Sequence, residues 1–440
     1  MKKLPLFKLP GVSLPHKKGT AKEAPVVMPS PKTVLMPLSM HIGAPATPVV
    51  KTGDLVKVGQ VIAEASGYVS AKIHSSVSGK VKNTDTTILS NGRKVSAILI
   101  ENDGLDTPFE ELAPREVSTL EELVCAVKDS GIVGLGGAGF PTAVKLNVKS
   151  VDEIVINGAE CEPYITSDTR TMIDRVDDIE FGVRLLKKCL DPKRIIFGIE
   201  KNKPECIEKI ERATSRISNV EVMPLKAVYP QGGEKVLVYH TTGKVIMEGK
   251  LPIDAGVIVI NCTTLAEIAS FIRTGMPLTR KCITIDGGAV AEPKNIIAPI
   301  GTRIADIIEF AGGLKEDPKK VILGGPMMGW SVESMEMPVM KNTNAVLFFN
   351  EEEAFVPDPT ACIKCGSCVN ACPFGLDPKA FVQALRAGDD EALVELKANI
   401  CMECGCCSFV CPAKRQLVHT NKIAKAKVMK ILKERQEVKK

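Results

Sequence analysis

Eight cysteines near the C-terminus have the residue type and the spacing of metal-cluster ligands. They form two runs of the pattern C-x2-C-x2-C-x3-C, and a proline follows each run. The first run consists of Cys362, Cys365, Cys368 and Cys372, and the second of Cys401, Cys404, Cys407 and Cys411. Thiolates at this spacing hold [4Fe-4S] clusters, which carry single electrons. The pattern therefore predicts a chain that transfers electrons.

The two runs predict two clusters with crossed ligands. In ferredoxins with two clusters, the fourth cysteine of each run binds the cluster of the other run. We therefore assign cluster 1 to Cys362, Cys365, Cys368 and Cys411, and cluster 2 to Cys372, Cys401, Cys404 and Cys407. Zinc sites more often use two separated C-x2-C pairs, and disulfides would require an oxidising compartment. Both alternatives fit the pattern less well.

The remaining cysteines lack such a pattern. Cys406 lies inside the second run but outside its spacing, so we expect a spectator thiol. Cys161 lies in a candidate ligand-binding segment, although nothing in its context requires a redox role. None of the five histidines has the spacing of a metal ligand.

A glycine-rich segment is the second place where residue types indicate chemistry. Residues 134–142 read GLGGAGFPT and contain the pattern G-x-G-x-x-G, with glycines at Gly134, Gly136, Gly137 and Gly139. A dinucleotide fingerprint needs a strand directly before the glycines and a helix after them. Here a helical pattern precedes the glycines and Pro141 follows, which disfavours a standard Rossmann site. Glycines still let backbone N–H groups approach a phosphate closely, and Lys145 could add a positive charge.

Two further segments follow predicted strands, where α/β sheets place their ligands. The first contributes Asn157, Glu160, Glu162 and Tyr164. The second contributes Asn261, Thr263 and Thr264, and either threonine could instead be a helix N-cap. Residues 229–235 form another glycine-rich turn with charged neighbours.

The N-terminal third of the chain predicts an arm and an all-β module. Residues 1–30 are rich in proline and lysine and indicate an irregular arm. Residues 31–102 alternate short β-branched runs with turn residues. Their GD-x-V-x-x-GQ-x-I phrase resembles the barrel-sandwich hybrids of lipoyl and biotinyl domains. The hairpin tip lacks the modified lysine of those domains, and Lys72 lies out of context, so we expect a structural module.

The rest of the chain predicts a multidomain protein of α/β and α+β class. Between residues 119 and 276, strands at 153–157, 194–199, 220–223 and 257–261 alternate with helices at 120–128, 179–190, 204–214 and 265–273. Residues 278–332 predict a β-grasp module with strands at 281–286, 296–299 and 321–323 and a helix at 304–311. Residues 333–357 predict a connector with one apolar strand, 345–349. The ferredoxin module (358–417) and a basic tail (418–440) follow.

Charge and hydropathy limit the function further. The net charge is +5, and residues 421–440 carry eight Lys and Arg against two Glu, so the body of the chain is close to neutral. The tail predicts a helix with Ile423, Ile431 and Leu432 as a thin apolar stripe, either solvated or docked on anionic lipid or an acidic partner. Aromatic residues make up 4%, too few for nucleic-acid stacking. We expect no signal peptide and no transmembrane helix, and hence a reducing compartment.

The segments GLGGAGFPT, NGAECEPYITSD, YPQGGEK and NCTTL resemble the flavin- and NADH-binding subunit of respiratory complex I. The order of modules is similar to the RnfC family, subunits of the membrane-associated NAD:ferredoxin oxidoreductase called the Rnf complex, over about residues 5–415. The β-grasp module would then be of the soluble-ligand-binding (SLBB) type. Two departures from complex I stand out: NGAECEP replaces NADEGEP, and twin clusters replace a single-cluster helical domain.

The resemblance implies an FMN- and NADH-binding domain at residues 119–276. In that family the glycine loop and Lys145 hold the phosphate and ribityl groups of non-covalent FMN. Asn157, Glu160, Glu162 and Tyr164 would lie by the isoalloxazine and nicotinamide, and Asn261 and Thr264 would also line the FMN site. The change from NADEGEP weakens the nicotinamide assignments more than the FMN ones.

The implied function is electron exchange between NAD(H), FMN and two [4Fe-4S] clusters, in a peripheral subunit of an ion-translocating complex. The implied partners are integral membrane and iron–sulfur subunits, with ferredoxin reached through the complex at the cytoplasmic face of the membrane. Hydride transfer at FMN needs no catalytic side chain, because the cofactor supplies the chemistry. Two other functions stay open: a soluble cobalamin-reductase-like enzyme, and a non-catalytic electron-wire scaffold with an empty flavin domain.

Overall fold

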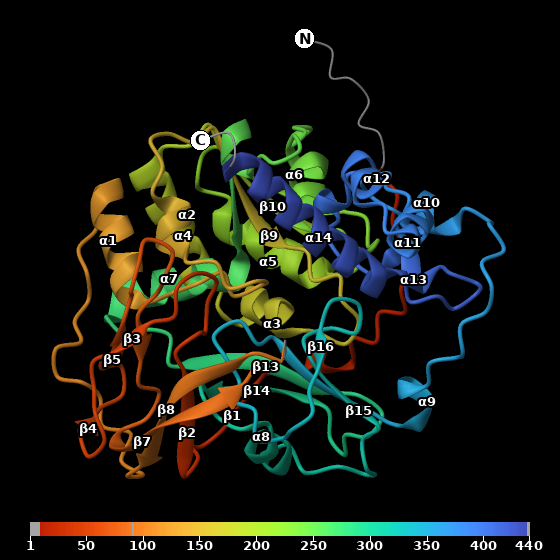
Figure 1. The fold of residues 1–440 in the computed structure, drawn as a ribbon. Helices are drawn as coiled ribbons and strands as arrows, with labels where there is room; N and C mark the ends of the chain where they lie inside the picture. The colour runs from red at the N-terminus through yellow and green to blue at the C-terminus, as the bar shows by residue number, and fades with distance from the viewer. Residues whose placement is uncertain (1–8, 90–91, 438–440) are drawn as a thin grey trace.

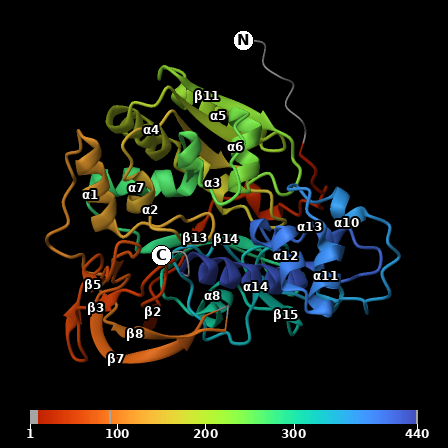
Figure 2. The same ribbon diagram turned by 45° about the horizontal axis from the view of Figure 1, so that its top comes forward.

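The computed structural model describes residues 9–89 and 92–437 of the chain (Figure 1). The barrel-sandwich module and the cysteine-rich module lie on opposite sides of the molecule, with the other modules between them (Figures 1 and 2). Residues 1–8 of the predicted arm, and Lys439 and Lys440 of the predicted tail, lie outside the described residues.

Two small antiparallel sheets form the module after the arm, and they confirm the predicted all-β class. The first sheet has the order β2 (Thr33–Pro37), β8 (Lys94–Asn102), β7 (Gly79–Ile88) and β4 (Leu55–Val56). The second has the order β3 (Thr47–Pro48), β5 (Val61–Glu64) and β6 (Ile73–His74). The module shares one hydrophobic core with the α/β domain, which fixes the two against each other.

A four-stranded parallel sheet is the centre of the α/β domain. Its order is β11 (Val220–Leu225), β10 (Arg194–Glu200), β9 (Glu153–Gly158) and β12 (Val257–Asn261). The helices of the domain are α1 (Leu120–Ser130), α2 (Thr142–Leu146), α3 (Ser167–Asp174), α4 (Val176–Leu190), α5 (Pro204–Thr214), α6 (Glu234–Thr242), η2 (Pro252–Ala255) and α7 (Cys262–Thr274). The central strands are continuous apolar runs, as expected for a parallel sheet covered on both faces. All the predicted strands and helices of this domain are confirmed.

A six-stranded mixed sheet forms the β-grasp module. Its order is β1 (Val26–Val27), β14 (Lys294–Pro299), β13 (Arg280–Asp286), β17 (Ala345–Phe349), β15 (Lys320–Leu323) and β16 (Trp330–Ser331). Helix α8 (Ile304–Phe310) belongs to the same hydrophobic core. The strand predicted within the connector is β17, and it lies at the centre of this sheet because all five of its residues are buried apolar side chains. The short helix α9 (Glu351–Ala354) follows it.

The N-terminal arm is an ordered strap across the α/β domain. Val12 pairs with Tyr229 as an isolated β-bridge, and the backbone N–H of Tyr164 donates to the carbonyl of His16. After the short helix η1 (Gly19–Lys22), β1 joins the edge of the β-grasp sheet beside β14. The arm therefore ties the α/β domain to the β-grasp module.

Lys341 ties three modules together at a buried point. Its ammonium donates to the carbonyl oxygens of Lys72 in the barrel-sandwich module (2.6 Å) and Gly131 in the α/β domain (2.7 Å). Complete burial lowers the pKa of Lys341 to about 7. Gly131 ends α1 with a positive φ and directly precedes the glycine-rich segment, so this clasp helps to position that segment.

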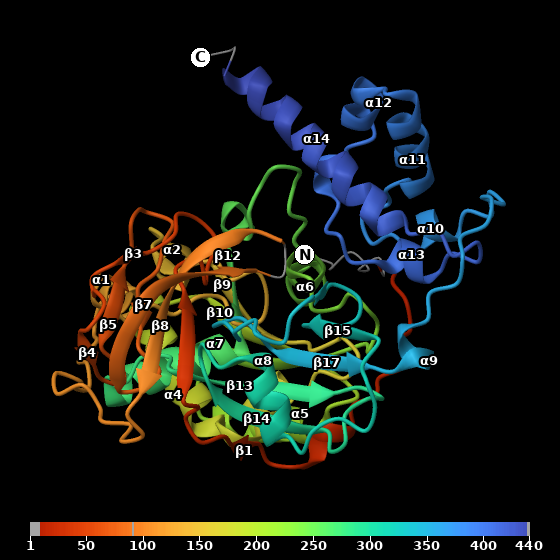
Figure 3. The same ribbon diagram turned by 60° about the horizontal axis from the view of Figure 1, so that its bottom comes forward.

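The cysteine-rich module (residues 358–437) is helical and stands apart from the sheets (Figure 3). Its elements are α10 (Ser367–Asn370), α11 (Pro378–Ala387), α12 (Asp390–Glu395), η3 (Ala398–Ile400), α13 (Cys406–Phe409) and α14 (Leu417–Glu437). The predicted tail is therefore a helix, and it begins before Asn421.

The apolar stripe of α14 differs from the one predicted. Leu417, Ala424 and Val428 are buried, whereas Ile423 is 57% exposed. Ala424 and Val428 belong to the core of the cysteine-rich module, and Leu432 packs at its edge. The sequence-based stripe was wrong at Ile423 because the helix covers α11 and η3 with residues spaced by three or four, starting at Leu417. Most of the predicted tail is thus an integral helix of the module.

Candidate functional site

Two cavities separate the eight cysteines of the repeated pattern into two groups of four. Cavity 1, of about 600 Å³, is lined among other residues by Cys362, Cys365, Cys368 and Cys411. Cavity 2, of about 20 Å³, is lined among other residues by Cys372, Cys401, Cys404 and Cys407, and also by Cys406, which lies outside the repeated pattern. These groups contain the same residues as the crossed ligand sets expected for clusters 1 and 2. In both cavities the fourth cysteine of one run lies with three from the other.

The backbone around the cysteines repeats together with the sequence. In each run the residue two after the first cysteine has positive φ, 56° at Lys364 and 60° at Glu403. A glycine two positions later does the same, 78° at Gly366 and 80° at Gly405. A four-residue helix, α10 or α13, then carries the third cysteine. Left-handed residues at matched positions turn both loops in the same way, so that each loop directs several thiols towards one space.

The two cavities differ in burial. Cys362 and Cys365 are exposed, whereas Cys401, Cys404 and Cys407 are buried. Within residues 9–89 and 92–437, no three His, Cys, Asp or Glu side chains are grouped closely enough to hold a single metal ion.

Asn421 on α14 was missed by the sequence analysis, which placed it in the tail. Its amide nitrogen lies 3.8 Å from the sulfur of Cys401 and 3.6 Å from that of Cys407, and its side chain is buried. Lys425, one turn later, donates to the carbonyl of Cys401 (2.8 Å) and pairs with Glu403 (2.8 Å). N–H donors to cluster sulfurs tune reduction potentials, so α14 belongs to the environment of cavity 2.

Cavity 2 also lies against the α/β domain. The hydroxyl of Tyr229 donates to the carbonyl of Cys404 (2.8 Å), and the thiol of Cys406 faces the carbonyl of Tyr229 (3.9 Å). A Cβ at Gly233 would lie 2.4 Å from the Met402 side chain, so residues 229–233 touch the loop that carries the cluster-2 cysteines. Cys161 packs against the apolar cluster that contains Tyr229, Cys404 and Cys406. Burial raises the pKa of its thiol to about 12.

The glycine loop forms an exposed turn at the edge of the α/β sheet. Gly136 and Gly137 are exposed, and a Cβ at Gly137 would meet no protein atom within 4 Å. A Cβ at Gly136 would instead lie 2.4 Å from the side-chain amide of Asn261. The helix α1 before the loop and the five-residue α2 after it confirm that this is no standard Rossmann fingerprint. The loop leaves open space beside its backbone at Gly137.

Residues at the carboxyl ends of strands β9 and β12 hold the base of the glycine loop. Asn157 and Asn261 lie side by side at the carboxyl ends of β9 and β12. Asn261 is the N-cap of α7, since its side chain accepts from the N–H of Thr264 (3.1 Å), so neither threonine has that role. The hydroxyl of Thr264 accepts from the backbone N–H of Leu135 in the glycine loop (3.0 Å). The structure thus brings the glycine loop, Asn157, Asn261 and Thr264 together.

Asp168 connects this base to the segment that contains Glu160, and the sequence analysis gave it no role. Its carboxylate accepts from the Asn261 amide (2.7 Å) and from the Thr263 hydroxyl (2.6 Å). The ITSD stretch after the Glu160 segment was visible in the sequence, but its link to β12 depends on tertiary structure.

Lys145 and Asn157 already have protein partners at this edge. The ammonium of Lys145 pairs with Glu234 (2.9 Å) and donates to the carbonyl of Val259 (3.0 Å). The amide of Asn157 donates to the carbonyl of Gly232 (3.0 Å) in the turn that faces cavity 2. Lys145 is partly exposed, and Glu234 compensates its charge at the strand ends.

Glu160, Glu162 and Tyr164 face other parts of the protein. Buried Glu160 accepts from the N–H of Asp168 (2.8 Å) and the hydroxyl of Thr169 (2.7 Å) at the start of α3, and burial raises its pKa. Glu162 accepts from the N–H groups of Met327 (3.0 Å) and Met328 (2.9 Å) in the β-grasp module. Burial raises the pKa of Glu162 to about 7 despite these two donors.

The N-terminal arm also holds the segment that contains Glu160, Glu162 and Tyr164. The ammonium of Lys18 donates to the carbonyls of Glu160 (2.9 Å), Glu162 (2.7 Å) and Ile165. The hydroxyl of Tyr164, a residue with φ of 69°, accepts from Lys17 (2.7 Å) and donates to Glu353 (2.7 Å). The segment after β9, residues 159–165, is therefore a loop held in shape by the arm, by α3 and by the β-grasp module.

In the barrel-sandwich module, the one candidate lysine for carrying a mobile group is held by ion pairs. Lys72, the one lysine considered there, pairs with Glu64 (3.4 Å) and Asp129 (3.2 Å), and its side chain is 19% exposed. An ammonium paired with two carboxylates is a poor attachment point for a mobile group. A structural role for the module fits this arrangement.

Family models match all four modules. They cover residues 7–105 (RnfC barrel sandwich hybrid domain), 127–270 (Nuo51 FMN-binding domain), 282–331 (SLBB domain) and 360–415 (4Fe-4S dicluster domain).

Several curated proteins are similar over most of the chain. The Na+-translocating ferredoxin:NAD+ oxidoreductase complex of Acetobacterium woodii has a subunit, designated C, that is 41% identical over 84% of this chain and 85% of its own. Its counterpart in the proton-translocating complex of Clostridium ljungdahlii is 42% identical, over 82% and 80%. The counterpart in the ion-translocating oxidoreductase complex of Rhodobacter capsulatus is 39% identical, over 87% and 75%.

Among solved structures, an NAD+-reducing [NiFe]-hydrogenase in the air-oxidized state matches with a TM-score of 0.51 and 19% identity. The match covers 70% of this chain and 63% of the hydrogenase chain. At this identity the likeness shows a shared fold alone.

Proposed function

Because this chain belongs to the RnfC family, whose members are subunits of ion-translocating ferredoxin:NAD+ oxidoreductase complexes, we propose how its sites act in such a complex. The chain is one subunit of a ferredoxin:NAD+ oxidoreductase, with an FMN-binding domain and a 4Fe-4S dicluster domain. In our proposal NAD(H) and FMN meet at the glycine loop, and cavities 1 and 2 hold [4Fe-4S] clusters 1 and 2. The chain exchanges electrons between NAD(H) and the rest of the complex.

One observation carries the proposal: the eight thiols form two sets of four, and the buried set lies against the α/β domain. The turn at residues 229–233 touches both Asn157, at the strand ends, and the loop of Cys404. Cavity 2 therefore adjoins the glycine-loop side of the molecule, and in our proposal it is the first of the two clusters to exchange electrons with FMN. This order suits a protein that accepts electrons at one end and delivers them at the other.

The residues of the glycine loop fit an FMN phosphate and ribityl chain. The backbone at Gly137 borders open space, and Gly136 lies so close to Asn261 that only hydrogen fits there. Lys145 adds a cation at the same edge. FMN, when bound, exchanges a hydride with NAD(H) and single electrons with iron–sulfur clusters. The chain supplies the position of the cofactor and its electrostatic surroundings.

The contacts of Glu160, Glu162 and Tyr164 support a positioning role for these side chains. Their polar atoms are engaged by α3, the β-grasp module and the arm. In the proposal they hold the 159–165 loop against the flavin site, and the backbone of that loop, together with Asn157, faces the nicotinamide. The ammonium of Lys18, which gathers three carbonyls, gives the loop its curvature.

Family membership favours this function over the two others that the sequence left open. The curated relatives are members of complexes, whereas a cobalamin-reductase-like enzyme would act in solution. An electron-wire scaffold would carry clusters without a flavin, and the open glycine turn favours a bound cofactor.

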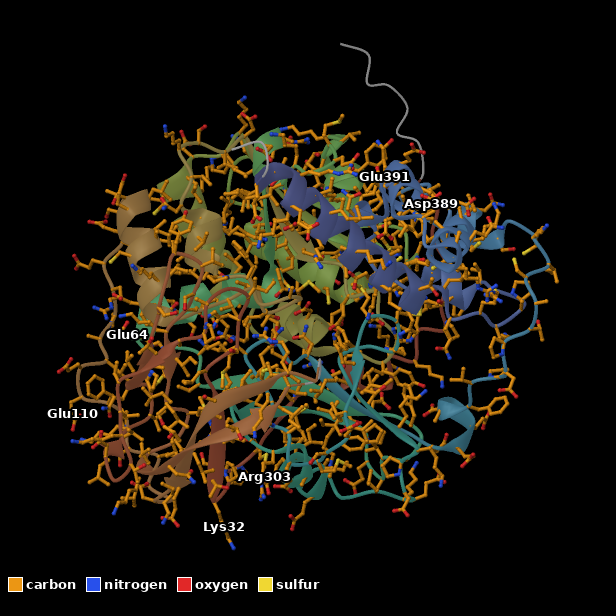
Figure 4. All side chains as sticks on the ribbon, viewed as in Figure 1. Lys32, Glu64, Glu110, Arg303, Asp389 and Glu391 are labelled. Atoms are coloured by element: carbon orange, nitrogen blue, oxygen red, sulfur yellow. The ribbon has the colours of Figure 1, made fainter. Side chains whose placement is uncertain are left out.

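The proposed partners are the integral membrane and iron–sulfur subunits of the complex, with the chain at the cytoplasmic face and ferredoxin reached through the complex. No helix in the described part of the chain is both long and apolar enough to cross a membrane. The basic α14 contributes less surface charge than its composition indicates, because Lys427 pairs with Asp390 (3.0 Å) and Arg435 pairs with Glu391. Glu391 is labelled in Figure 4. These pairs favour a solvated helix over direct lipid docking.

Anaerobic purification with quantitation of flavin, iron and sulfide tests the proposal, and Gly137→Val is the informative variant. No protein atom lies within 4 Å of a Cβ at Gly137, so the folded chain tolerates the branched side chain. We expect a wild-type melting temperature, both clusters and at least about tenfold less retained FMN, because ~1.4 kcal/mol of lost binding energy already gives a factor of ten. NADH should then reduce neither cluster, while dithionite reduces both.

Full flavin retention in Gly137→Val would remove the glycine loop from the cofactor site. Wild-type protein with eight irons but no flavin after gentle anaerobic isolation would favour the scaffold. Gly53→Val is the matched control, since Gly53 also has no neighbour within 4 Å of an added Cβ and belongs to the barrel-sandwich module. It should retain flavin, although its positive φ will lower stability.

A further inference from the structure

A turn of the β-grasp module lies against the glycine loop. We call residues 340–343 the β-grasp turn. The N–H of Met340 donates to the hydroxyl of Thr343 (3.0 Å), and the N–H of Thr343 donates to the carbonyl of Met340 (3.0 Å). Directly after the turn, the carbonyl of Asn344 accepts from the N–H of Thr284 in β13 (2.9 Å). The turn is therefore closed on itself and anchored to the β-grasp sheet.

Two side chains of the β-grasp turn hold carbonyl groups of the α/β domain. The buried ammonium of Lys341 donates to the carbonyl of Gly131, at the base of the glycine loop (2.7 Å). The side-chain amide of Asn342 donates to the carbonyl of Gly137, in the exposed part of the loop (2.9 Å). The loop is thus held at two points by a module other than its own.

The bond from Asn342 fixes the direction of a neighbouring N–H group. The peptide between Gly137 and Ala138 is trans, so its carbonyl and its N–H point in opposite directions. Because Asn342 holds the carbonyl, the N–H of Ala138 faces away from the β-grasp turn. Within the part of the chain that the structure describes, the N–H groups of residues 136–138 donate to no protein acceptor. A hydrogen bond to the carbonyl also polarises the peptide and strengthens its N–H as a donor.

We propose that Asn342 is a positioning residue of the flavin site, which orients the peptide between Gly137 and Ala138 so that its N–H faces the phosphate of bound FMN. This proposal rests on the proposed function, because it takes the glycine loop to hold that phosphate. Lys341 supports the same geometry from the base of the loop. The β-grasp turn lies outside the ranges that the four family models match, so the flavin site extends beyond the FMN-binding domain.

A simpler role for the Asn342 bond is to join two modules. A bond with that role alone stabilises the folded chain whether or not a flavin is bound, and its loss does not distinguish one flavin from another. Riboflavin separates the two roles, because it is FMN without the phosphate group. A residue that orients an N–H group towards the phosphate contributes to the affinity for FMN and not to the affinity for riboflavin.

The test uses the full-length protein with its clusters, from which flavin is removed and to which FMN or riboflavin is returned. Asn342→Ala removes the donor without adding a charge, and the half-buried position tolerates the smaller side chain. Asn102→Ala is the matched control. The half-buried amide of Asn102 also donates to a backbone carbonyl, that of Pro31 (3.0 Å), but it belongs to β8 of the barrel-sandwich module.

Quenching of flavin fluorescence on binding gives the dissociation constants for both flavins. We expect Asn342→Ala to bind FMN about fivefold more weakly than wild type, the factor that one typical net hydrogen bond contributes. Its affinity for riboflavin should equal that of wild type. Asn102→Ala should match wild type for both flavins, and both variants should keep the wild-type iron content.

Wild-type affinity of Asn342→Ala for FMN overturns the proposal. So does an equal loss of affinity for FMN and riboflavin, which assigns the bond to general support of the loop. Full FMN retention in Gly137→Val, or a wild-type protein that binds no FMN, would instead contradict the proposed function, so the two failures are distinguishable.

Discussion

The two cysteine cavities have the same local construction and very different surroundings. Both are formed by loops with the same left-handed positions and the same four-residue helix. Cavity 1 is about 600 Å³ and has exposed cysteines, whereas cavity 2 is about 20 Å³ and has mostly buried ones. The repeat specifies how a cluster is ligated, and the packing of each loop specifies what the cluster can reach.

The surroundings also predict different electronic environments. Cavity 2 has the amide of Asn421 beside two of its sulfurs and the Tyr229 hydroxyl on its backbone. Cavity 1 has exposed cysteines, and four basic side chains, Lys364, Lys379, Arg386 and Arg415, belong to its lining. Cluster potentials depend on hydrogen bonds to sulfur, net charge and solvent exposure, so two distinct potentials are expected from one repeated motif.

Truncation of α14 should have the largest effect, because it should disrupt cavity 2 and largely spare cavity 1. Deletion of residues 421–440 removes Asn421, Ala424 and Val428, all buried beside cavity 2. We expect loss of the cluster-2 EPR signal and a cluster 1 that is retained or only partly lost. Deletion of residues 433–440 keeps Leu432 and the whole core, and should leave both clusters and the melting temperature unchanged.

The short deletion is also the proper test of a role for the tail at lipid. A deletion from Asn421 would confuse attachment with loss of a cluster. Equal co-sedimentation of full-length and 433–440-deleted protein with anionic vesicles, at low and high salt, would leave these residues no role in attachment to lipid. A normal cluster-2 signal after the long deletion would contradict the integral position of α14.

Replacement of Asn421 should change one cluster and spare the other. Asn421→Leu keeps the side-chain size but removes the N–H donor near Cys401 and Cys407. A donor stabilises the more negative reduced state, so its loss should lower the potential of cluster 2. Potentiometric EPR titration is the measurement, and cluster 1 in the same sample is the internal control. A shift of both potentials, or of neither, would show that the amide does not act on cavity 2.

We expect a smaller effect, on the pH dependence of stability, from a change at Glu162, which contacts the β-grasp module. Its folded pKa is raised to about 7, above the ordinary 4.5. Between these values the folded state holds a proton that the unfolded state has released, so stability falls as the pH rises through this window. Glu162→Gln mimics the protonated form and should flatten that slope, by at most ~1.4 kcal/mol per pKa unit.

Melting temperatures between pH 5 and pH 8 check this expectation. Wild type and Glu162→Gln should match near pH 5 and diverge towards pH 8, with the variant more stable. Glu110→Gln is the control and should follow wild type, because Glu110 is an exposed carboxylate in the segment between the barrel-sandwich module and α1 (Figure 4). A constant difference between wild type and Glu162→Gln at all pH values would assign the change to lost hydrogen bonds.

Local patterns predicted much of this molecule. The continuous apolar strands of the α/β domain and its amphipathic helices were placed correctly because their periods are strong. The repeated cysteine spacing carried enough information to group the thiols as the two cavities group them, although the ligands themselves stay a prediction until clusters are observed.

Long-range contacts could not be predicted from the sequence. The arm looked irregular because Lys17 and Lys18 act through carbonyls and a tyrosine far along the chain. α14 looked like a tail because its buried stripe is short and its charges dominate the composition. The sequence did not show which glycine of the loop is crowded; Gly136 is pressed against Asn261, and only the fold places β12 there.

Spin relaxation of the two reduced clusters by a dysprosium chelate in solution tests the difference between the cavities most directly. Cys411→Ala and Cys372→Ala identify which EPR signal belongs to which cavity, and Cys406→Ala, outside both predicted ligand sets, should keep both signals. The prediction is strong relaxation enhancement for the signal that Cys411→Ala removes, and little for the signal that Cys372→Ala removes. Equal enhancement of both signals, or enhancement of the second alone, would contradict an exposed cluster 1 and a buried cluster 2.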